Sequence, residues 1–376
     1  WTGPASLALD IVGGLRALGC DVDFAIAGFV HDGMQHAIRR HAEELGLPLR
    51  EGLQLRRHFH LRQFQRDAAL LAQWIDAGDY DVLHCHQKGD HLVAGLAAAR
   101  AKRTVQLVRS LWDGRAPRRS LRTAMAFRRT TALTLPFAMP GEARLARRFG
   151  LTPDRVRVVA GPIAERFFTP AIDDAAVAAR RRSAKQKLGL DPQRHVVGIT
   201  ARIQRKRRWD LLWDLVACSP HELQFVVLGR PDAGVFDQVC TEPLRKRGAQ
   251  HRVTFLGYRE GADYVEALQA LDTFVFLVPG SDATCRALRE AMAVGIPVLT
   301  TKLGLLPHIV EDGVTGLVRE ASVDRLAQGL HVLLRDEGVA CGFAERARAH
   351  AREAWSVERT ARDLLALYAS LGGDGS

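Results

Sequence analysis

The chain has 376 residues, of which 47% are hydrophobic and 25% charged, and its formal net charge is +11 at pH 7. These values are ordinary for a globular protein, and the length suits two or three domains of roughly 150 residues each. No run approaches the roughly 20 apolar residues that a membrane-spanning helix needs. The cysteines show no metal-binding spacing, so we expect reduced thiols in a cytoplasmic protein. They are Cys20, Cys85, Cys218, Cys240, Cys285 and Cys341.

The chain opens with a turn that contains Gly3 and leads into a helix. Apolar residues over 5–18 recur at helical spacing until Gly19, and a strand over 22–27 follows. Asp21 and Asp23 have the spacing of an Asp-x-Asp metal site, but they follow a helix end, so we interpret them as structural and expect no metal. Because such a helix normally follows a central strand, we expect a further strand of about ten residues to precede Trp1 in the natural protein.

Two later strands of the N-terminal half, over 81–86 and 105–109, end in polar residues. His86 ends the first strand, Arg109 ends the second, and Trp112 follows shortly after. These three side chains are the candidates for ligand contact in this half. Packing inside the domain is the alternative interpretation for His86 and for the neighbouring His84.

Arginine is concentrated in two segments of the N-terminal half, 56–66 and 115–129. Three interpretations stay open: a solvated basic face, a surface that docks on an anionic membrane, or a nucleic-acid surface. Neither segment lies in a recognisable nucleic-acid motif, so we expect no nucleic-acid partner. The arginines concerned are Arg56, Arg57, Arg62, Arg66, Arg115, Arg118, Arg119, Arg122, Arg128 and Arg129.

The chain crosses to a second domain near Gly161-Pro162, and an Ala- and Arg-rich solvated helix is expected over 173–187. A strand over 196–201 then ends at Arg202, followed by a basic turn with Lys206 and Arg207 and by a helix over 209–217. A further strand is predicted over 225–229. We predict domains over 1–163 and 164–355, and a C-terminal helix and tail over 356–376.

Strands and helices alternate rapidly between residues 252 and 316. Strands are expected over 253–257, 273–278 and 298–300, and helices over 263–271 and 286–294. This alternation predicts a parallel sheet with helices on its faces, and ligands of such sheets bind beyond the carboxyl ends of the strands. The turn over 280–285 must lie there.

Two carboxylates frame that turn. Asp282 lies in the turn and Glu290 on the helix behind it, and the free N–H groups of Thr284 to Arg286 favour phosphate oxygens. Carboxylates for sugar hydroxyls beside a phosphate cradle indicate a nucleotide-sugar site.

The segment from Arg252 to Gly316 resembles the donor-binding half of family-4 glycosyltransferases. It contains Asp282-x7-Glu290-Ala-Met-Ala, then Gly-x-Pro-Val, and ends in Ile-Val-Glu-Asp-Gly-Val-Thr-Gly. The usual form in the family is Glu-Gly-Phe-Gly-x4-Glu-Ala. Here Asp282 replaces the first glutamate, and Ala283, Thr284 and Cys285 replace Gly-Phe-Gly.

The resemblance implies a GT-B-like fold, in which two doubly wound, Rossmann-like α/β domains face a cleft and a C-terminal helix crosses back to the first domain. It also implies transfer of a sugar from a nucleotide diphosphate sugar to an acceptor hydroxyl, with retention and without cofactor or metal. Glu290 would hold the donor ribose. Asp282 and the N–H groups of Ala283 to Arg286 would hold the sugar. Arg202 and Arg207 would stabilise the diphosphate, with Lys206 as the alternative to Arg207.

The N-terminal half resembles the acceptor domain of the same family. The resemblance leaves Gly3 to face the donor phosphates, and it places His86, Arg109 and Trp112 on the acceptor side. The family often has a histidine where Trp112 stands and a glutamate where His308 stands. The implied partners are a nucleotide-sugar donor and a glycan or lipid-linked acceptor, in cell-surface glycan or lipopolysaccharide synthesis, in the cytoplasm or at the inner face of the cell membrane.

Two other functions stay open. One is a non-catalytic relative that binds a nucleotide sugar or a glycan, and the other is a nucleotide-sugar epimerase on the same architecture. An NAD-dependent oxidoreductase is not favoured, because no Gly-x-Gly-x-x-Gly follows a strand.

Overall fold

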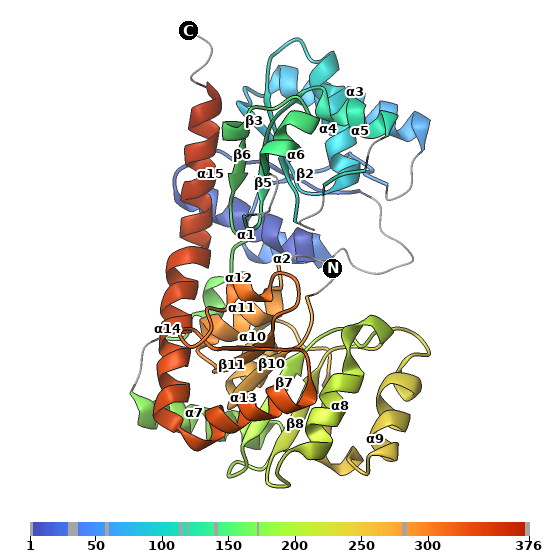
Figure 1. The fold of residues 1–376 in the computed structure, drawn as a ribbon. Helices are drawn as coiled ribbons and strands as arrows, with labels where there is room; N and C mark the ends of the chain where they lie inside the picture. The colour runs from blue at the N-terminus through green and yellow to red at the C-terminus, as the bar shows by residue number, and fades with distance from the viewer. Residues whose placement is uncertain are drawn as a thin grey trace. The chain divides into compact units, whose positions relative to one another are not determined.

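The computed structural model describes residues 3–28, 37–56, 60–112, 116–118, 120–138, 142–170, 173–279 and 284–372. The chain forms two compact units: Trp1–Pro162 with Trp355–Ser376 make up the first, and Ile163–Ala354 the second. Each unit is an α/β structure built on parallel strands (Figure 1). Among the described residues, no helix is both long enough and apolar enough to cross a bilayer.

The first unit contains a parallel sheet in the order β3-β4-β5-β6 and a separate parallel pair, β1-β2. The strand predicted over 22–27 pairs only at Phe24 and Ala25. The strands are β1 (Phe24–Ala25), β2 (Leu49–Arg50), β3 (Val82–Cys85), β4 (Gln106–Ser110), β5 (Thr130–Leu135) and β6 (Val156–Val158). The helices are α1 (Gly3–Ala17), α2 (Ala37–Glu44), α3 (Leu61–Ala77), α4 (Lys88–Arg100), α5 (Leu121–Phe127), α6 (Glu142–Arg148) and α15 (Val357–Gly372).

The C-terminal helix α15 packs along α1, as Figure 1 shows. Gly14 allows this close approach, because a Cβ atom there would lie 2.7 Å from Cγ1 of Val357. Leu364 is buried in the same apolar cluster as Leu7, and the Thr360 hydroxyl donates a hydrogen bond of 3.0 Å to the Ala160 carbonyl. The predicted return of the C-terminal helix to the first domain is confirmed.

The second unit contains a six-stranded parallel sheet in the order β12-β11-β10-β7-β8-β9. Its inner strands are buried runs of β-branched and apolar residues, as expected for a sheet covered on both faces. The strands are β7 (Val196–Thr200), β8 (Gln224–Leu228), β9 (Val253–Gly257), β10 (Thr273–Phe276), β11 (Val298–Thr301) and β12 (Leu317–Arg319). The helices are α7 (Asp174–Lys187), α8 (Trp209–Cys218), α9 (Glu242–Lys246), α10 (Gly261–Gln269), α11 (Arg286–Val294), α12 (Leu306–Ile309), α13 (Val323–Arg335) and α14 (Glu337–Trp355).

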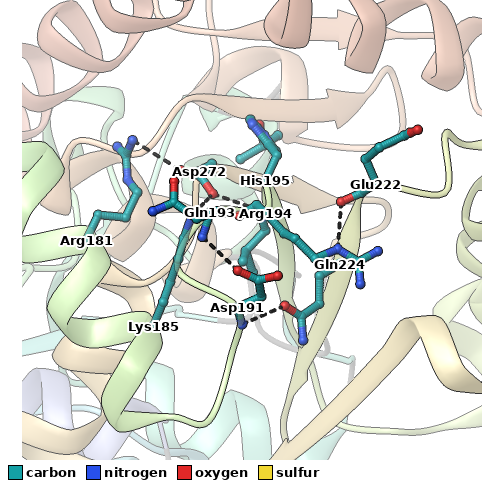
Figure 2. A network of polar contacts seen from close by, with 11 residues as sticks. Arg181, Lys185, Asp191, Gln193, Arg194, His195, Glu222, Gln224 and Asp272 are labelled. Carbon is teal, nitrogen blue, oxygen red and sulfur yellow. Dashed lines mark hydrogen bonds and ion pairs between the residues drawn. The ribbon is translucent and has the colours of Figure 1, made fainter.

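An ionic cluster ties α7 to the amino ends of β7 and β10 (Figure 2). The Asp272 carboxylate lies 2.6 Å from Nζ of Lys185 and 3.2 Å from the guanidinium of Arg181, and it accepts a 2.7 Å hydrogen bond from the backbone N–H of Val196. Lys185 also donates to the Arg194 carbonyl at 2.8 Å. The helix over 173–187, predicted to be solvated, is therefore anchored on one side by a lysine whose side chain is 5% exposed.

Replacing Lys185 with Met should destabilise the protein by about 3 kcal/mol, because a mostly buried carboxylate then loses its nearest counter-charge. Lys187→Met is the matched control, since Lys187 lies on the same helix and pairs with Glu266 with its side chain 63% exposed. An exposed pair contributes at most about 1 kcal/mol. Urea unfolding of both variants measures the difference, and equal losses of stability would contradict this assignment.

Candidate functional site

The second unit changes winding direction between β7 and β10. From β7 the chain builds outward through β8 and β9, then returns to the other side of β7 with β10, β11 and β12. In open parallel sheets a ligand site lies beyond the carboxyl ends of the strands at such a switch point. Thr200 ends β7 there, and the turn after β10 leads into α11 at the same edge.

Glu290 lies on α11 close to this edge and is 5% exposed. Its carboxylate accepts a hydrogen bond of 2.6 Å from Nε of Arg286, one turn earlier on the helix, with that side chain 17% exposed. A buried carboxylate is tolerated only when it is paired in this way. The predicted ribose-binding acid and one of the predicted phosphate-binding residues therefore form an ion pair.

Tyr264 of α10 connects Glu290 to the end of β7. Burial raises the pKa of the Tyr264 hydroxyl well above its usual value, and the charge of Glu290 raises it further, whereas Thr200 lowers it. Although both groups are close enough to influence this pKa, neither the Tyr264 hydroxyl nor the buried Thr200 hydroxyl has a well-aligned hydrogen-bond partner among the described residues. These two buried hydroxyls and the Glu290 carboxylate thus lie together at the switch point.

Arg202 follows β7 and lies against the turn after β8. Its Nε atom is 2.8 Å from the Asp232 carboxylate. The same carboxylate also accepts a hydrogen bond of 2.9 Å from the side-chain amide of Gln204. Gly229 lets the two chains approach: its φ is +148°, and a Cβ atom there would lie 2.0 Å from the Ala201 carbonyl oxygen. The Arg202 side chain is 54% exposed, so this pair is weak enough to rearrange around an anionic ligand.

A short basic turn, Arg205–Arg207, separates Arg202 from α8. Lys206 is exposed and has no ion-pair partner among the described residues, whereas Arg207 is half-buried. Arg208 follows with a left-handed backbone (φ 53°) and begins α8 without a side-chain cap. The first N–H groups of α8 therefore have no capping side chain beside this basic turn, an arrangement that favours phosphate oxygens.

The turn before α11 is only partly within the described residues. Asp282 and Ala283 lie outside them, as do Arg57, Arg115 and Arg119 of the two arginine-rich segments. Thr284 is buried, and Cys285 is buried with φ of +43°. A non-glycine residue in this region is strained, and such strain gathers at functional turns. Like α8, α11 starts without a side-chain cap.

In the first unit, the predicted residues His86, Arg109 and Trp112 meet at the carboxyl ends of β3 and β4. The Trp112 indole N–H donates to Nδ1 of His86 at 3.2 Å, and the two rings are parallel within 2° at a centroid distance of 6.1 Å. Buried Arg109 donates to the Cys85 carbonyl at 3.4 Å. Gly3 is the first residue of α1, where helix N–H groups lack intrahelical partners.

The Asp-x-Asp pair near β1 has structural contacts. Asp23 accepts hydrogen bonds from Arg50, at 2.7 Å, and from the Tyr80 hydroxyl. Among the described residues, no three His, Cys, Asp or Glu side chains lie together as metal ligands. None of the six cysteines, all within the described ranges, forms a disulfide.

A hollow of about 290 Å³ opens at the opposite, amino edge of the second sheet, lined by Arg181, His195, Asp272 and Arg348 among others. Its polar groups include the ionic cluster that anchors α7, so we place the site at the carboxyl edge, where the switch point, the Glu290–Arg286 pair and the basic turn coincide.

Sequence reasoning missed Tyr264, Thr200 and Asp232. Tyr264 lies on the apolar face of α10 beside Val265 and Leu268, and Thr200 ends a strand whose other residues are apolar, so each looks like part of the core. Asp232 is one of several acids after β8. The signal available was position alone, since Thr200 ends the parallel strand β7 and Asp232 follows the carboxyl end of β8.

Two family models match the two halves of the chain. Residues 1–165 match the model described as Glycosyltransferase Family 4, and residues 180–353 match Glycosyl transferases group 1. The chain belongs to the family-4 glycosyltransferases with the GT-B fold. The resemblance on which the sequence analysis relied is thereby confirmed.

Relatives from bacteria match over part of their length. The chain is 33% identical to the D-inositol 3-phosphate glycosyltransferase of Mycobacterium marinum over 198 residues, which are 52% of this chain and 42% of that protein. It is 28% identical to the lipopolysaccharide core biosynthesis mannosyltransferase LpsB of Rhizobium meliloti over 200 residues, 51% of this chain and 56% of that protein. The chain thus spans about half the length of the relatives it matches.

Solved structures match over nearly the whole chain. Anabaena Alr3699/HepE, in complex with UDP and glucose, has a TM-score of 0.76 at 19% identity, covering 98% of this chain and 96% of that one. A glycosyltransferase from Rickettsia africae has a TM-score of 0.79 at 14% identity, and the match covers 99% of this chain and 95% of that one. At these identities the likeness shows the fold, and the predicted GT-B-like class is confirmed.

Tyr264→Phe should leave the free energy of unfolding unchanged or raise it by up to about 1 kcal/mol, because it removes a buried hydroxyl that lacks a well-aligned partner. Tyr80→Phe is the matched control. It removes a hydroxyl that donates to the Asp23 carboxylate, and should cost about 1 to 2 kcal/mol. Denaturant unfolding compares the two variants. A loss for Tyr264→Phe as large as that for Tyr80→Phe would show that the Tyr264 hydroxyl is already satisfied.

Proposed function

We propose that the protein transfers a sugar from a nucleotide diphosphate sugar to a hydroxyl of a glycan or lipid-linked acceptor, with retention and without metal or cofactor. The observation that carries this proposal is the switch-point edge of the second sheet. It combines a buried, paired carboxylate on α11 with a basic turn beside the start of α8, which has no side-chain cap. This set of groups suits a nucleotide diphosphate.

Glu290 would accept hydrogen bonds from the ribose hydroxyls. Its carboxylate is paired with Arg286 at 2.6 Å, and a carboxylate in such a pair offers only hydrogen-bond acceptors. Tyr264 is kept protonated by its raised pKa and adds a donor beside that carboxylate. In this proposal Glu290 binds the donor and does not act as a nucleophile.

Arg202, Lys206 and Arg207 would surround the departing diphosphate. Negative charge grows on the leaving group as the glycosidic bond breaks, and fixed cations and helix N–H groups stabilise that charge. Asp282 and the N–H groups of Ala283 to Arg286 would hold the sugar hydroxyls. Retention follows if an oxygen of the leaving phosphate accepts the proton of the acceptor hydroxyl on the same face of the sugar.

The acceptor class is supported by two names among the relatives, an inositol phosphate glycosyltransferase and a lipopolysaccharide core mannosyltransferase. The donor class is supported by the likeness to a fold solved with UDP and with UDP-glucose. On this chain, His86, Arg109 and Trp112 form the proposed acceptor side.

Glu290→Ala should lower the release of nucleoside diphosphate from UDP-glucose, GDP-mannose or ADP-glucose by about a hundredfold or more, since donor contact and the Arg286 pair are lost together. Glu345→Ala is the matched control, because Glu345 is an exposed helix glutamate of the same unit, and it should stay within about twofold of wild type. Unfolding curves exclude misfolding as the cause. A Glu290→Ala protein as active as Glu345→Ala would overturn the donor site.

We further propose that the first unit docks on the anionic inner face of the cell membrane through α5. Leu121 and Met125 lie one turn apart on this helix and are 79% and 42% exposed. Arg122 is exposed beside them, and Arg128 and Arg129 are exposed at the helix end, whereas the segment 121–129 contains no acidic residue. Exposed apolar side chains within a basic surface are typical of peripheral membrane contact.

The double variant Leu121→Ser/Met125→Ser should sediment at least about tenfold less with vesicles rich in phosphatidylglycerol than wild type, because two apolar side chains no longer enter the interface. Leu45→Ser is the control, since Leu45 is 58% exposed elsewhere in the same unit. Neutral phosphatidylcholine vesicles should bind every variant weakly. Equal binding of wild type to both lipids, or no effect of the double variant, would overturn membrane docking through α5.

A further inference from the structure

Trp112 fixes which nitrogen of His86 carries a proton. An indole N–H can only donate, so Nδ1 of His86, 3.2 Å away, must be the acceptor. A neutral imidazole with an accepting Nδ1 carries its hydrogen on Nε2. Burial, followed by the nearby charge of Arg109, lowers the pKa of His86 to about 3, so the ring stays neutral at physiological pH.

The Trp112 ring is itself held in place by packing. It is 3% exposed and shares an apolar cluster with Leu7 of α1 and Leu364 of α15. A Cβ atom at Gly161 would lie 3.3 Å from the indole ring, so the neighbouring backbone also contacts it closely. The direction of the indole N–H is therefore set by the core of the first unit.

A second series of side-chain contacts, through His84, holds the His86 ring in place. His86 stacks on His84 at a centroid distance of 4.4 Å. The two ring nitrogens of His84 lie 2.6 Å from the Tyr368 hydroxyl and 2.7 Å from the Ser110 hydroxyl, and Ser110 continues to Thr134 at 2.6 Å. Tyr368 belongs to α15, so the C-terminal helix contributes one of the side chains that hold His84 in place.

The other groups near His86 contact its backbone or act on its charge, and none of those that the structure describes forms a hydrogen bond with Nε2. The Asp90 carboxylate accepts a hydrogen bond of 3.1 Å from the backbone N–H of His86. The charge of Arg109 lowers the pKa of the His86 ring. Within the ranges that the structure describes, Nε2 has no hydrogen-bond partner, and it is not among the buried unpaired atoms. His86 is only partly buried, so an N–H group with a fixed direction is left without a hydrogen-bond partner among the described residues at the carboxyl edge of β3 and β4.

We propose that Trp112 and the Tyr368–His84–Ser110 chain position His86 as a hydrogen-bond donor, whose Nε2–H binds an oxygen atom of the acceptor, either a hydroxyl or a phosphate oxygen. His86 is then a binding residue and not the base that removes the acceptor proton. Trp112, His84 and Tyr368 are positioning residues. The identity of the bound molecule as the acceptor rests on the proposed function, whereas the tautomer and its cause do not.

The tautomer is tested by NMR on the full chain with ¹⁵N-labelled histidine, with the His86 signals assigned by their loss in His86→Gln. Wild type should show the Nε2–H form without protonation from about pH 5.5 to 8. Trp112→Phe keeps an aromatic ring but removes the donor, so His86 should then exchange between tautomers. A wild-type His86 that carries its hydrogen on Nδ1, or that titrates in this range, would overturn the proposal whatever reaction the protein catalyses.

The donor role is tested by two substitutions of His86, assayed with UDP-glucose, GDP-mannose and ADP-glucose in turn. Acceptor probes are D-inositol 3-phosphate and inositol without the phosphate. The amide N–H of Gln reaches the position of Nε2, so His86→Gln should keep the KM for the acceptor within about threefold of wild type. His86→Leu should raise it about tenfold. An effect confined to the phosphorylated probe identifies a phosphate oxygen as the partner, and an effect on both probes identifies a hydroxyl.

Equal and large losses of kcat in His86→Gln and His86→Leu would indicate proton abstraction and contradict the donor role. Tyr368→Phe is the test of positioning: it should raise the KM for the acceptor about threefold and leave the KM for the donor unchanged. If wild type acts on neither probe, the proposed acceptor class fails, while the NMR measurement still decides the tautomer.

Discussion

The burial of the Glu290 carboxylate is the constraint on which the second unit's site depends. A carboxylate in the interior needs a counter-charge and hydrogen-bond donors. Arg286 supplies both from one turn earlier on α11, so the helix carries its own pair into the site. The strained turn at Cys285 sets where that helix begins. The ion pair, the turn and the start of α11 therefore depend on one another in position, and they lie near the carboxyl end of β7.

The two edges of the second sheet differ in how completely their polar groups are satisfied. At the amino edge, the Asp272 carboxylate is saturated by Lys185, Arg181 and a backbone N–H, and this saturation holds α7 in place. At the carboxyl edge, the Arg202–Asp232 pair is largely exposed, and the exposed Lys206 has no ion-pair partner in the described ranges. One edge stabilises the fold, and the other leaves polar groups for a ligand.

Local patterns in the sequence predicted the helix that carries Glu290. Gly295 at its end and Pro297 beyond it mark the same bounds, Arg286–Val294, that the structure shows. Gly295 has a φ of +86°, as a helix-ending glycine should. The parallel sheet followed from the rapid alternation of strands and helices, and His86, Arg109 and Trp112 were found as polar residues at or just beyond strand ends.

What the sequence could not supply are contacts set by packing. Arg202 pairs with Asp232 only because β7 and β8 are neighbours and Gly229 lets their ends approach. Tyr264 looked like a core residue, because its nearness to Glu290 depends on how α10 and α11 pack. Tyr368 and His84 are 284 positions apart and meet only because α15 returns to the first unit. Periodicity predicts which face of an element is buried, but not which distant side chain lies against it.

The central claim is that the edge around Glu290 binds a nucleoside diphosphate. Thermal unfolding of wild type and Glu290→Ala with UDP, GDP, ADP, TDP and CMP, each compared with the same protein without ligand, tests it most directly. A ligand at a hundredfold excess over its Kd adds roughly 2.7 kcal/mol of stability. If this edge binds the donor, one diphosphate should stabilise wild type, and the effect should disappear in Glu290→Ala. Stabilisation by none of the nucleotides, or an equal shift in the variant, would contradict it.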